Sequence, residues 1–437
     1  MSELALLGGN RAVSLKEPVW PQIGEPEIAA LDEAFEASHD DSTYLNSMTG
    51  EGPVAEFEAH MERYFGRAHA VATGSCAAAL QMALYAAGVG AGDEVIVSPY
   101  TWGQTVSPIL HQLAVPIFAD IDEDSYCITP AAVEATITER TKAIMVVHIF
   151  GHPADMDPIL DIARQHDLPV IEDCAQAMGA KYKGKAVGTF GDLACFSFGD
   201  GKQIIGGDGG CVVTDDDKCH QRLVEIGSHI GRQERDISDS ELTPYIDSLT
   251  YTFRMHPIAA VIVNTQLDFL EQWHQERRAN HHRLSSGLAD VPCIKPVAES
   301  DNVEHCFHIY GPSFLVENAG GVSRETFIAA VEAEGVPFSS GYVRRPIYLR
   351  KRFQDRRYFF GKGLPWSLHP SSESLYKAGD CPVAEHRCAE TELQVRWSSS
   401  LRGDQSELVD QYLQAFRNVS ENLDRLKDWQ ERQAGAA

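Results

Sequence analysis

Residues 193–214 read LACFSFGDGKQIIGGDGGCVVT, and this stretch decides the fold. A short apolar run at each end predicts two strands, and because no helix separates them we expect an antiparallel pair. Between the runs, six glycines surround Lys202 within residues 197–210. Glycine in such number indicates unusual backbone angles or the close approach of another group to the main chain. The simpler alternative is a loop between strands that carries a surface lysine.

Upstream of this stretch, apolar runs alternate with helical patterns. Strands that are apolar on both faces and separated by helices predict an α/β fold, with a mainly parallel central sheet covered by helices. In such sheets, ligands bind at the carboxyl ends of the strands. The strand-like runs are HAVATGS (69–75), EVIVSPY (94–100), VPIFADI (115–121), KAIMVVHIFG (142–151) and LPVIEDCA (168–175).

Beyond about residue 274 the pattern changes to mixed strands and helices, which indicates a second, smaller α+β domain. We expect an N-terminal arm at 1–20, a large domain at 21–273 and a small C-terminal domain at 274–437. Within the last, residues 351–380 are polar, aromatic and irregular. Long irregular segments in compact domains are usually functional or disordered. We expect this one to close over a substrate, and a disordered solvent loop is the alternative.

The composition restricts the partners of this protein. Its 437 residues carry a net charge of −26, from 37 basic and 63 acidic side chains, which argues against a nucleic acid or an anionic membrane as partner. The ten cysteines form no C-x-x-C pair, so we expect neither a disulfide framework nor a metal site. The chain shows no basic leader followed by an apolar core and no run of about 18 apolar residues. We therefore expect a soluble, cytoplasmic protein.

Three chemically suggestive groups come directly after predicted strands. Asp173 ends an apolar strand, where a carboxylate is costly to bury unless a cation meets it; a cap of a following helix is the alternative. Residues 74–78 predict a turn and a helix N-terminus, whose free N–H groups suit a phosphate; simple capping by Ser75 is the alternative. Trp102 follows another strand and offers a flat stacking surface or ordinary packing.

Together with Lys202, these groups fit one ligand, pyridoxal phosphate. Its chemistry needs a lysine for a Schiff base and an acid that faces the pyridine nitrogen. It also needs a phosphate cup and a flat surface for the ring. One chain supplies all four groups at strand ends, so we interpret Lys202 and Asp173 as the catalytic pair of a pyridoxal-phosphate enzyme.

Four motifs carry a resemblance to a known family: VIEDCAQAMGAKYKGKAVGTFGDLACFSF (170–198) followed by the lysine and GGDGG, EVIVSPYTWGQT (94–105), HIFGHPADMDPI (148–159) and CPVAEH (381–386). They are similar to those of the DegT/DnrJ/EryC1/StrS aminotransferases, which aminate keto-sugars and keto-cyclitols. The resemblance covers nearly the whole chain. It implies a fold type I transferase that uses pyridoxal phosphate and its pyridoxamine form, assembled as a homodimer with shared active sites.

The resemblance also implies a role for each matching residue. Lys202 would form the Schiff base, and Asp173 would face the pyridine nitrogen. The other cofactor contacts would be Gln176 near the 3′ oxygen, Trp102 on the ring, Ser75, Cys76, Ala77 and Ser197 at the phosphate, and Thr252.

Three positions depart from the family pattern. Gly199 stands where the family usually has His or Gln, and Ala77 stands where it often has Thr, so Ser75 and backbone N–H groups must bind more of the phosphate. Thr252 replaces the Asn that reaches the neighbouring subunit's phosphate in many members. Two candidate substrate contacts are Arg254, for which a structural salt bridge is the alternative, and Tyr342.

We therefore expect a pyridoxal-phosphate-dependent aminotransferase. Its donor would be L-glutamate or L-glutamine, and its acceptor a keto-cyclitol or a keto-sugar, either free or nucleotide-linked. One alternative is a sugar dehydratase or other eliminase, but the family's dehydratases carry histidine in place of Lys202. A second alternative is a non-catalytic regulatory member of the fold, against which the intact pair of Lys202 and Asp173 argues.

Overall fold

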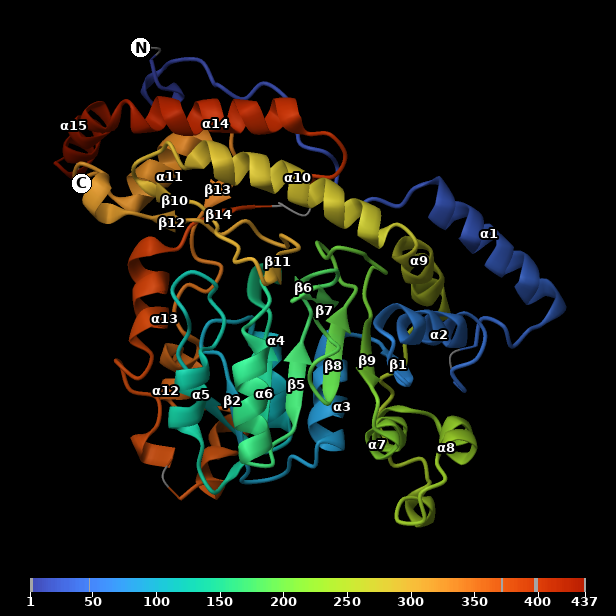
Figure 1. Ribbon diagram of the computed structural model, residues 1–437. Helices are drawn as coiled ribbons and strands as arrows, with labels where there is room; N and C mark the ends of the chain where they lie inside the picture. Colours follow the sequence, from blue (N-terminus) through green and yellow to red (C-terminus); the bar gives the residue numbers. More distant parts are fainter. Residues whose placement is uncertain (1–2, 47, 371, 397–399, 436–437) are drawn as a thin grey trace.

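The computed structural model describes residues 3–46, 48–370, 372–396 and 400–435. Its central element is a seven-stranded sheet with the strand order β1-β9-β8-β5-β4-β2-β3 (Figure 1). β9 pairs antiparallel with β1 and β8, and all other neighbours are parallel. Both the mainly parallel sheet and the antiparallel pair around Lys202 are thus confirmed. The strands are β1 (His69–Thr73), β2 (Glu94–Val97), β3 (Val115–Phe118), β4 (Thr141–Val147), β5 (Val170–Asp173), β8 (Leu193–Ser197) and β9 (Gly210–Thr214).

Helices cover both faces of this sheet, because successive side chains of a strand point to opposite faces and both sets are apolar here. In β1, Val71 packs into the core that includes α3, whereas Ala70 and Ala72 pack into the core that includes α2. Among the described residues, no helix is both long and apolar enough to cross a membrane. The helices of this part are α1 (Glu25–Asp40), α2 (Pro53–Phe65), α3 (Cys76–Ala86), α4 (Gly103–His111), α5 (Pro130–Thr136), α6 (Met156–Gln165), α7 (Asp217–Gly227), α8 (Ile230–Asp236) and α9 (Pro257–Leu267).

A second core forms a layer at one end of the sheet (Figure 1). The N-terminal arm belongs to it: Leu4 is buried, and the Val13 N–H donates to the carbonyl oxygen of Glu334 at 3.0 Å. The domain limits expected above stay a prediction. The elements of this layer are α10 (Leu270–Leu288), α11 (Arg324–Ala333), α14 (Ser406–Ser420), α15 (Leu423–Ala434), and the strand pairs β10 (Ile294–Lys295) with β12 (Ser313–Phe314) and β13 (Phe338–Ser339) with β14 (Gln394–Val395). A three-stranded sheet, β11-β6-β7, joins the two parts: β6 (Lys181–Tyr182), β7 (Lys185–Ala186) and β11 (Val303–Glu304).

The described residues of the segment 351–380 do not form a cover over a substrate. Phe353, Trp366 and Tyr376 are buried in the core of the large sheet, and the Tyr376 hydroxyl donates to the carbonyl oxygen of Pro116 on β3 at 2.8 Å. His369 pairs with Glu94 at the amino end of β2, opposite the carboxyl ends where ligands bind. The segment, with α12 (Lys351–Gln354) and the following α13 (Pro382–His386), therefore packs along the β3 edge.

Candidate active site

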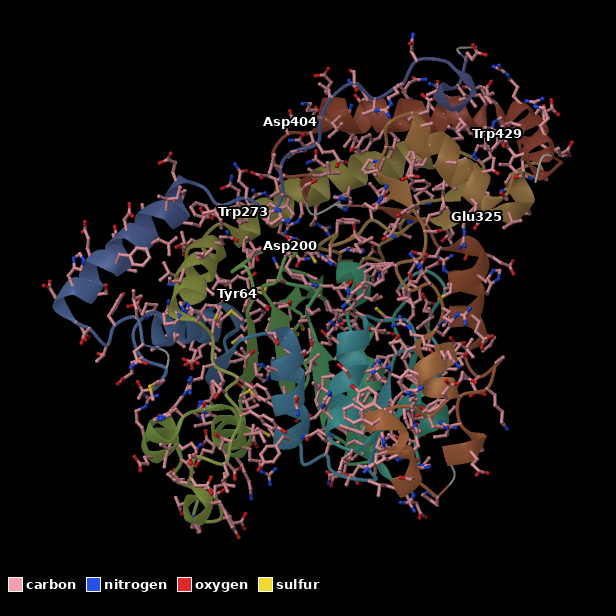
Figure 2. All side chains as sticks on the ribbon, turned by 180° about the vertical axis from the view of Figure 1, so that it is seen from behind. Tyr64, Asp200, Trp273, Glu325, Asp404 and Trp429 are labelled. Carbon is pink, nitrogen blue, oxygen red and sulfur yellow. The ribbon has the colours of Figure 1, made fainter. Side chains whose placement is uncertain are left out.

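A cavity of about 740 Å³ opens at the carboxyl ends of the strands, where residues of the sheet and of the C-terminal layer meet. Figure 2 labels one lining residue, Asp200, at this junction. Most of the residues expected to act together share its wall. They are Ser75, Cys76, Ala77, Trp102, Asp173, Gln176, Ser197, Lys202 and Tyr342.

The glycine-rich loop brings Lys202 into this cavity by a path that few other residues could follow. Gly207 has a φ of +81°, in the left-handed region that favours glycine, and an added Cβ there would meet nothing within 4 Å. A Cβ on Gly210 would lie 2.6 Å from the carbonyl carbon of Ser75 and 2.7 Å from the nitrogen of Cys76. The loop thus needs glycine both for its backbone angles and for the contact between β9 and the start of α3.

Lys202 is electrostatically suited to act as an amine. Burial lowers the pKa of its ammonium group below the ordinary 10.5, and the nearby Cys76 and Asp173 oppose this effect without reversing it. A lysine with a lowered pKa is neutral in a larger fraction of molecules, and the neutral amine is the nucleophile and the base.

Asp173 ends β5 as a buried carboxylate that is 3% exposed. Its Oδ2 accepts a hydrogen bond from the Thr105 hydroxyl at 2.7 Å, and its Oδ1 accepts one from the Ala175 N–H at 3.1 Å. Burial raises the pKa of Asp173, and these two hydrogen bonds oppose the rise. The alternative of a helix cap is wrong, because the chain after β5 forms turns and no helix begins there.

The start of α3 and the end of β8 form a second group of donors in the cavity. Ser75 caps α3 by accepting a hydrogen bond from the Ala78 N–H at 3.3 Å. The N–H groups of Cys76 and Ala77 belong to the first turn, where a helix offers them no internal partner. Such a helix end favours an anion. Ser197 adds a hydroxyl from β8.

Gln176 and Tyr342 are held by each other. The Gln176 side chain donates to the Tyr342 hydroxyl at 2.6 Å and accepts from the Phe150 N–H at 2.7 Å. Burial raises the pKa of Tyr342, so the phenol is neutral. The Tyr342 ring lies 5.6 Å from that of Trp102, whose side chain is half exposed. Together these two rings give the cavity an aromatic wall.

Two of the expected residues, Thr252 and Arg254, do not line this cavity. They lie beside the end of β1, where Arg254 forms a bridge with Thr73 and the Gly74 N–H donates to the carbonyl oxygen of Phe253 at 2.6 Å. The chain at 252–254 thus holds the turn that leads into α3, and the side chains of Thr252 and Arg254 lie outside this cavity.

Several lining residues were not predicted. Thr105 follows Trp102 by three residues, so the helical spacing after that strand gave a signal for it. Gln104 lies beside it in the first turn of α4. Other lining residues that were not predicted come from the arm, the glycine loop and the C-terminal layer: Trp20, Asp200, Asp208, His308, Gln394 and Arg396.

A group of potential metal ligands, His148, Glu172 and Cys174, lies beside this cavity. The His148 ring bonds Glu172 at 3.0 Å and also accepts a hydrogen bond from the Ala154 N–H at 3.0 Å. Glu172 accepts three further hydrogen bonds, from the N–H groups of Gly188, Phe190 and Gly191. These contacts tie the turn at 188–191 to β5 and account for the cluster without an ion.

The residues of the cavity fit pyridoxal phosphate. A buried carboxylate, an amine of lowered pKa, a helix N-terminus and an aromatic wall are what its ring nitrogen, aldehyde, phosphate and ring face require. The close contact of Gly210 with Ser75 and Cys76 holds the phosphate donors next to the lysine loop. Asp173, which accepts a hydrogen bond from Thr105, would hold the ring nitrogen, and Lys202 would hold the aldehyde carbon.

The comparisons with known proteins agree with this chemistry. A model of the DegT/DnrJ/EryC1/StrS aminotransferase family matches residues 31–395. The L-glutamine:2-deoxy-scyllo-inosose aminotransferase of Micromonospora echinospora is 32% identical, over 98% of this chain and 100% of that protein. The UDP-N-acetyl-3-dehydro-alpha-D-glucosamine 3-aminotransferase of Acidithiobacillus ferrooxidans is 35% identical, over 84% of this chain and 88% of that protein.

A solved structure shows the same architecture. The aminotransferase of Psychrobacter cryohalolentis superposes with a TM-score of 0.78 at 28% identity, over 94% of this chain and 100% of that chain. Other structures of this fold were solved in pyridoxal and pyridoxamine phosphate forms. The protein is therefore an aminotransferase whose cofactor is pyridoxal phosphate, and the chain belongs to the DegT/DnrJ/EryC1/StrS aminotransferase family.

Proposed function

We propose that this enzyme moves the amino group of L-glutamine or L-glutamate to a keto-cyclitol, with a keto-sugar, either free or nucleotide-linked, as the second candidate acceptor. The observation that carries the proposal is the meeting of Lys202 and Asp173 in one cavity. The cyclitol comes first because the relative named for 2-deoxy-scyllo-inosose matches this chain over 98% of its length, and the relative named for a UDP-sugar over 84%.

Each residue would have a distinct task. Lys202 would hold the cofactor through a Schiff base and, once the donor displaces it, carry the proton removed from the donor Cα on its Nζ. Asp173 would keep the ring nitrogen protonated, because an anion at close range favours the charged form. The bound cofactor supplies an electron sink for the negative charge that develops at Cα.

The remaining residues would bind and orient. The first turn of α3, with Ser75, Cys76 and Ala77, and the Ser197 hydroxyl would hold the phosphate. Trp102 would stack on the ring, while Gln176, fixed by Tyr342, would lie near the 3′ oxygen. Tyr342 would then face the substrate.

We also propose a homodimer in which each subunit completes its partner's cavity. Thr252 and Arg254 lie outside their own cavity, and the preceding loop exposes apolar side chains. Leu249 is 90% exposed and Tyr251 54%, which is unusual for an isolated surface. A second copy that covers them would bring Thr252 to the other subunit's phosphate and Arg254 to its substrate.

Mixed dimers test this arrangement. Arg254→Ala and Lys202→Ala subunits are each expected to be inactive as homodimers. If Arg254 acts across the interface, co-expressed mixed dimers regain one intact site and a corresponding part of the activity. Mixed dimers without activity, although isolated as dimers, would show that Arg254 acts in its own subunit. An Arg254→Ala homodimer with the activity of the parent would show that Arg254 has no role in the reaction.

The two half-reactions test the function itself. L-glutamine or L-glutamate should convert the cofactor to its pyridoxamine form, which the absorbance spectrum reports. Adding 2-deoxy-scyllo-inosose or the UDP-keto-sugar should then return the original spectrum, and the faster acceptor identifies the class. A cofactor spectrum that neither donor changes would contradict the proposal. Location in the cytoplasm and the division at residues 20 and 273 stay proposals from the sequence.

A further inference from the structure

Two threonine hydroxyls form a chain that ends on Asp173. The Thr105 hydroxyl donates to Oδ2 of Asp173 at 2.7 Å, and the Thr101 and Thr105 hydroxyl oxygens lie 2.9 Å apart. Thr101 is 0% exposed and Thr105 4%, so bulk water does not compete for these bonds.

The direction of the chain follows from the number of hydrogens. A hydroxyl has one hydrogen to donate. Thr105 uses its hydrogen on Asp173, so it can only accept from Thr101. The hydrogen bonds therefore run from Thr101 to Thr105 to Asp173. Donors that point in one direction polarise one another, and the last bond, to an ionised carboxylate, is the strongest.

Thr105 also connects the carboxylate to the aromatic wall. Its backbone N–H donates to the carbonyl oxygen of Trp102 at 3.1 Å in the first turn of α4, while its side chain holds Asp173 on β5. One residue thus sets the distance between the residue that would stack on a ring and the residue that would meet its nitrogen.

The other oxygen of Asp173 is held independently. Oδ1 accepts from the Ala175 N–H at 3.1 Å. With one donor on each oxygen, the carboxylate cannot rotate without breaking a hydrogen bond inside a buried site, where an unpaired acceptor is costly. The hydrogen bond from the Ala175 backbone does not depend on the side chain of Thr105. A substitution of Thr105 can therefore remove one hydrogen bond to Asp173 and leave the other in place.

We propose that Thr105 is a positioning residue for the cofactor's ring nitrogen: it keeps Asp173 anionic and in one orientation, and Thr101 strengthens it from behind. This inference rests on the proposed role of Asp173 in the aminotransferase. Thr105 does not touch the reacting atoms. It acts through the carboxylate, which meets the nitrogen only if its free lone pair points into the cavity.

Four variants of the holoenzyme separate this role from a general loss of packing. Thr105→Val keeps the shape and removes the hydroxyl, and Thr105→Ser restores it. Thr101→Val removes only the outer donor. Thr265→Val is the matched control, because its hydroxyl bonds a carbonyl one turn away on α9, outside the cavity.

The readouts are the ¹⁵N chemical shift of labelled cofactor, its dissociation constant and kcat with a saturating donor. For Thr105→Val we expect a shift toward the unprotonated ring nitrogen, weaker cofactor binding and kcat lower by about 10- to 100-fold, the range for a hydrogen bond to a charged group. Thr105→Ser should recover most of this, Thr101→Val should fall between, and Thr265→Val should match the parent.

An unchanged ¹⁵N shift and kcat in a folded Thr105→Val protein would overturn the inference. So would a loss that Thr105→Ser does not recover, since that result would indicate packing. If Thr105→Val does not fold, the parent and Thr105→Ser are compared with Thr105→Ala instead. The proposed function fails in a different way: the parent would bind cofactor with a protonated nitrogen, yet neither donor would convert it.

Discussion

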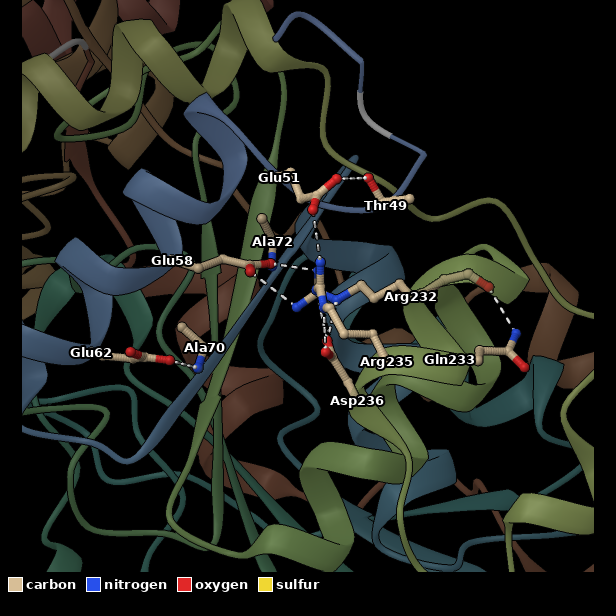
Figure 3. Close-up of polar contacts among 11 residues, drawn as sticks. Thr49, Glu51, Glu58, Glu62, Ala70, Ala72, Arg232, Gln233, Arg235 and Asp236 are labelled. Carbon is tan, nitrogen blue, oxygen red and sulfur yellow. Dashed lines mark hydrogen bonds and ion pairs between the residues drawn. The ribbon is translucent and has the colours of Figure 1, made fainter. Parts of the chain in front are cut away.

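Lys202 and Arg232 are two basic side chains near the large sheet, and their surroundings differ. Arg232, 6% exposed, donates to both oxygens of Glu58 at 2.9 and 3.0 Å and to Asp236 at 3.1 Å (Figure 3). None of the ion pairs between described residues involves Lys202. Burial lowers the pKa of Lys202, whereas at Arg232 the Glu58 and Asp236 carboxylates outweigh burial and raise it.

The presence or absence of carboxylate partners distinguishes a charge that stabilises the structure from one that can take part in chemistry. Glu58 on α2 also accepts from the Ala72 N–H of β1 at 2.7 Å, so the Arg232 network ties α8 to α2 and to the sheet edge (Figure 3). A charge that donates to two carboxylates is held in one place and one protonation state. A charge that forms no ion pair can lose its proton, which a nucleophile and base must do.

The largest effect is expected at the unpaired charge. Lys202→Ala should lower transamination by about 10⁴-fold or more, as removal of a covalent catalytic residue does, and should eliminate the Schiff-base absorbance. Its free energy of unfolding should stay within about 1 kcal/mol of the parent, since no carboxylate loses its partner. Stopped-flow absorbance and urea unfolding measure the two quantities. Retained turnover would remove Lys202 from the mechanism.

For Arg232, which is paired with two carboxylates, we expect the opposite: a substitution should affect stability more than activity. Arg232→Met leaves Glu58 buried without its partner and should lower the free energy of unfolding by about 3–5 kcal/mol. Arg235→Met is the control: Arg235 pairs with Asp236 and Glu51 near the surface (Figure 3), where such a pair contributes about 0.2–1 kcal/mol. Equal unfolding midpoints for the two variants would show that burial does not set the strength of the Arg232 network.

Asp173→Asn removes the carboxylate charge that shares the cavity with Lys202 while keeping the shape of the side chain. Because a single well-placed electrostatic partner typically contributes about 10²–10³ in rate, kcat should fall by this factor. The amide can still accept from Thr105, so folding should be nearly unaffected. Both half-reactions should slow, since both need the protonated ring. Activity within a few-fold of the parent would leave Asp173 with a structural role only.

The smallest expected effect is on how the stability of the protein changes with pH. Lys202 has a lowered pKa in the folded protein and the ordinary pKa of 10.5 in the unfolded chain. At a pH between these two values, the unfolded chain keeps a proton on this lysine that the folded protein has released. Stability rises with pH wherever the unfolded state binds more protons, so this lysine makes the cofactor-free protein more stable as pH rises toward 10.5. Urea unfolding of Lys202→Met should lack this rise. A parallel pH profile for the two proteins would mean that Lys202 is not desolvated.

Much of the site could be predicted because the ligand-binding residues of a parallel sheet gather at the carboxyl ends of its strands. Asp173, Trp102 and Ser75 each follow an apolar run, and parallel strands bring such positions to one edge. His308 and Arg396 could not be found this way, because they reach the cavity from a layer whose strands are only two residues long. No periodicity marks elements of that length.

The segment 351–380 was misread for a related reason. Its apolar residues are widely spaced among charged ones, so neither a strand nor a helix period emerges. Phe353 and Tyr376 nevertheless pack their rings against each other and against Phe118 of β3. These side chains are buried because they pack against a strand more than two hundred residues earlier in the chain, and the local sequence pattern carries no information about that contact.

That placement also bears on whether the sheet can associate edge to edge with another molecule. β3 is the last strand of the sheet, and an uncovered last strand offers unpaired carbonyl and N–H groups to which a strand of another molecule can add. Here the Tyr376 hydroxyl donates a hydrogen bond to the carbonyl oxygen of Pro116, and the Cys381 thiol donates one to the carbonyl oxygen of Phe118. The segment, together with the adjoining Cys381, thus covers the edge to which a strand of another molecule could otherwise add.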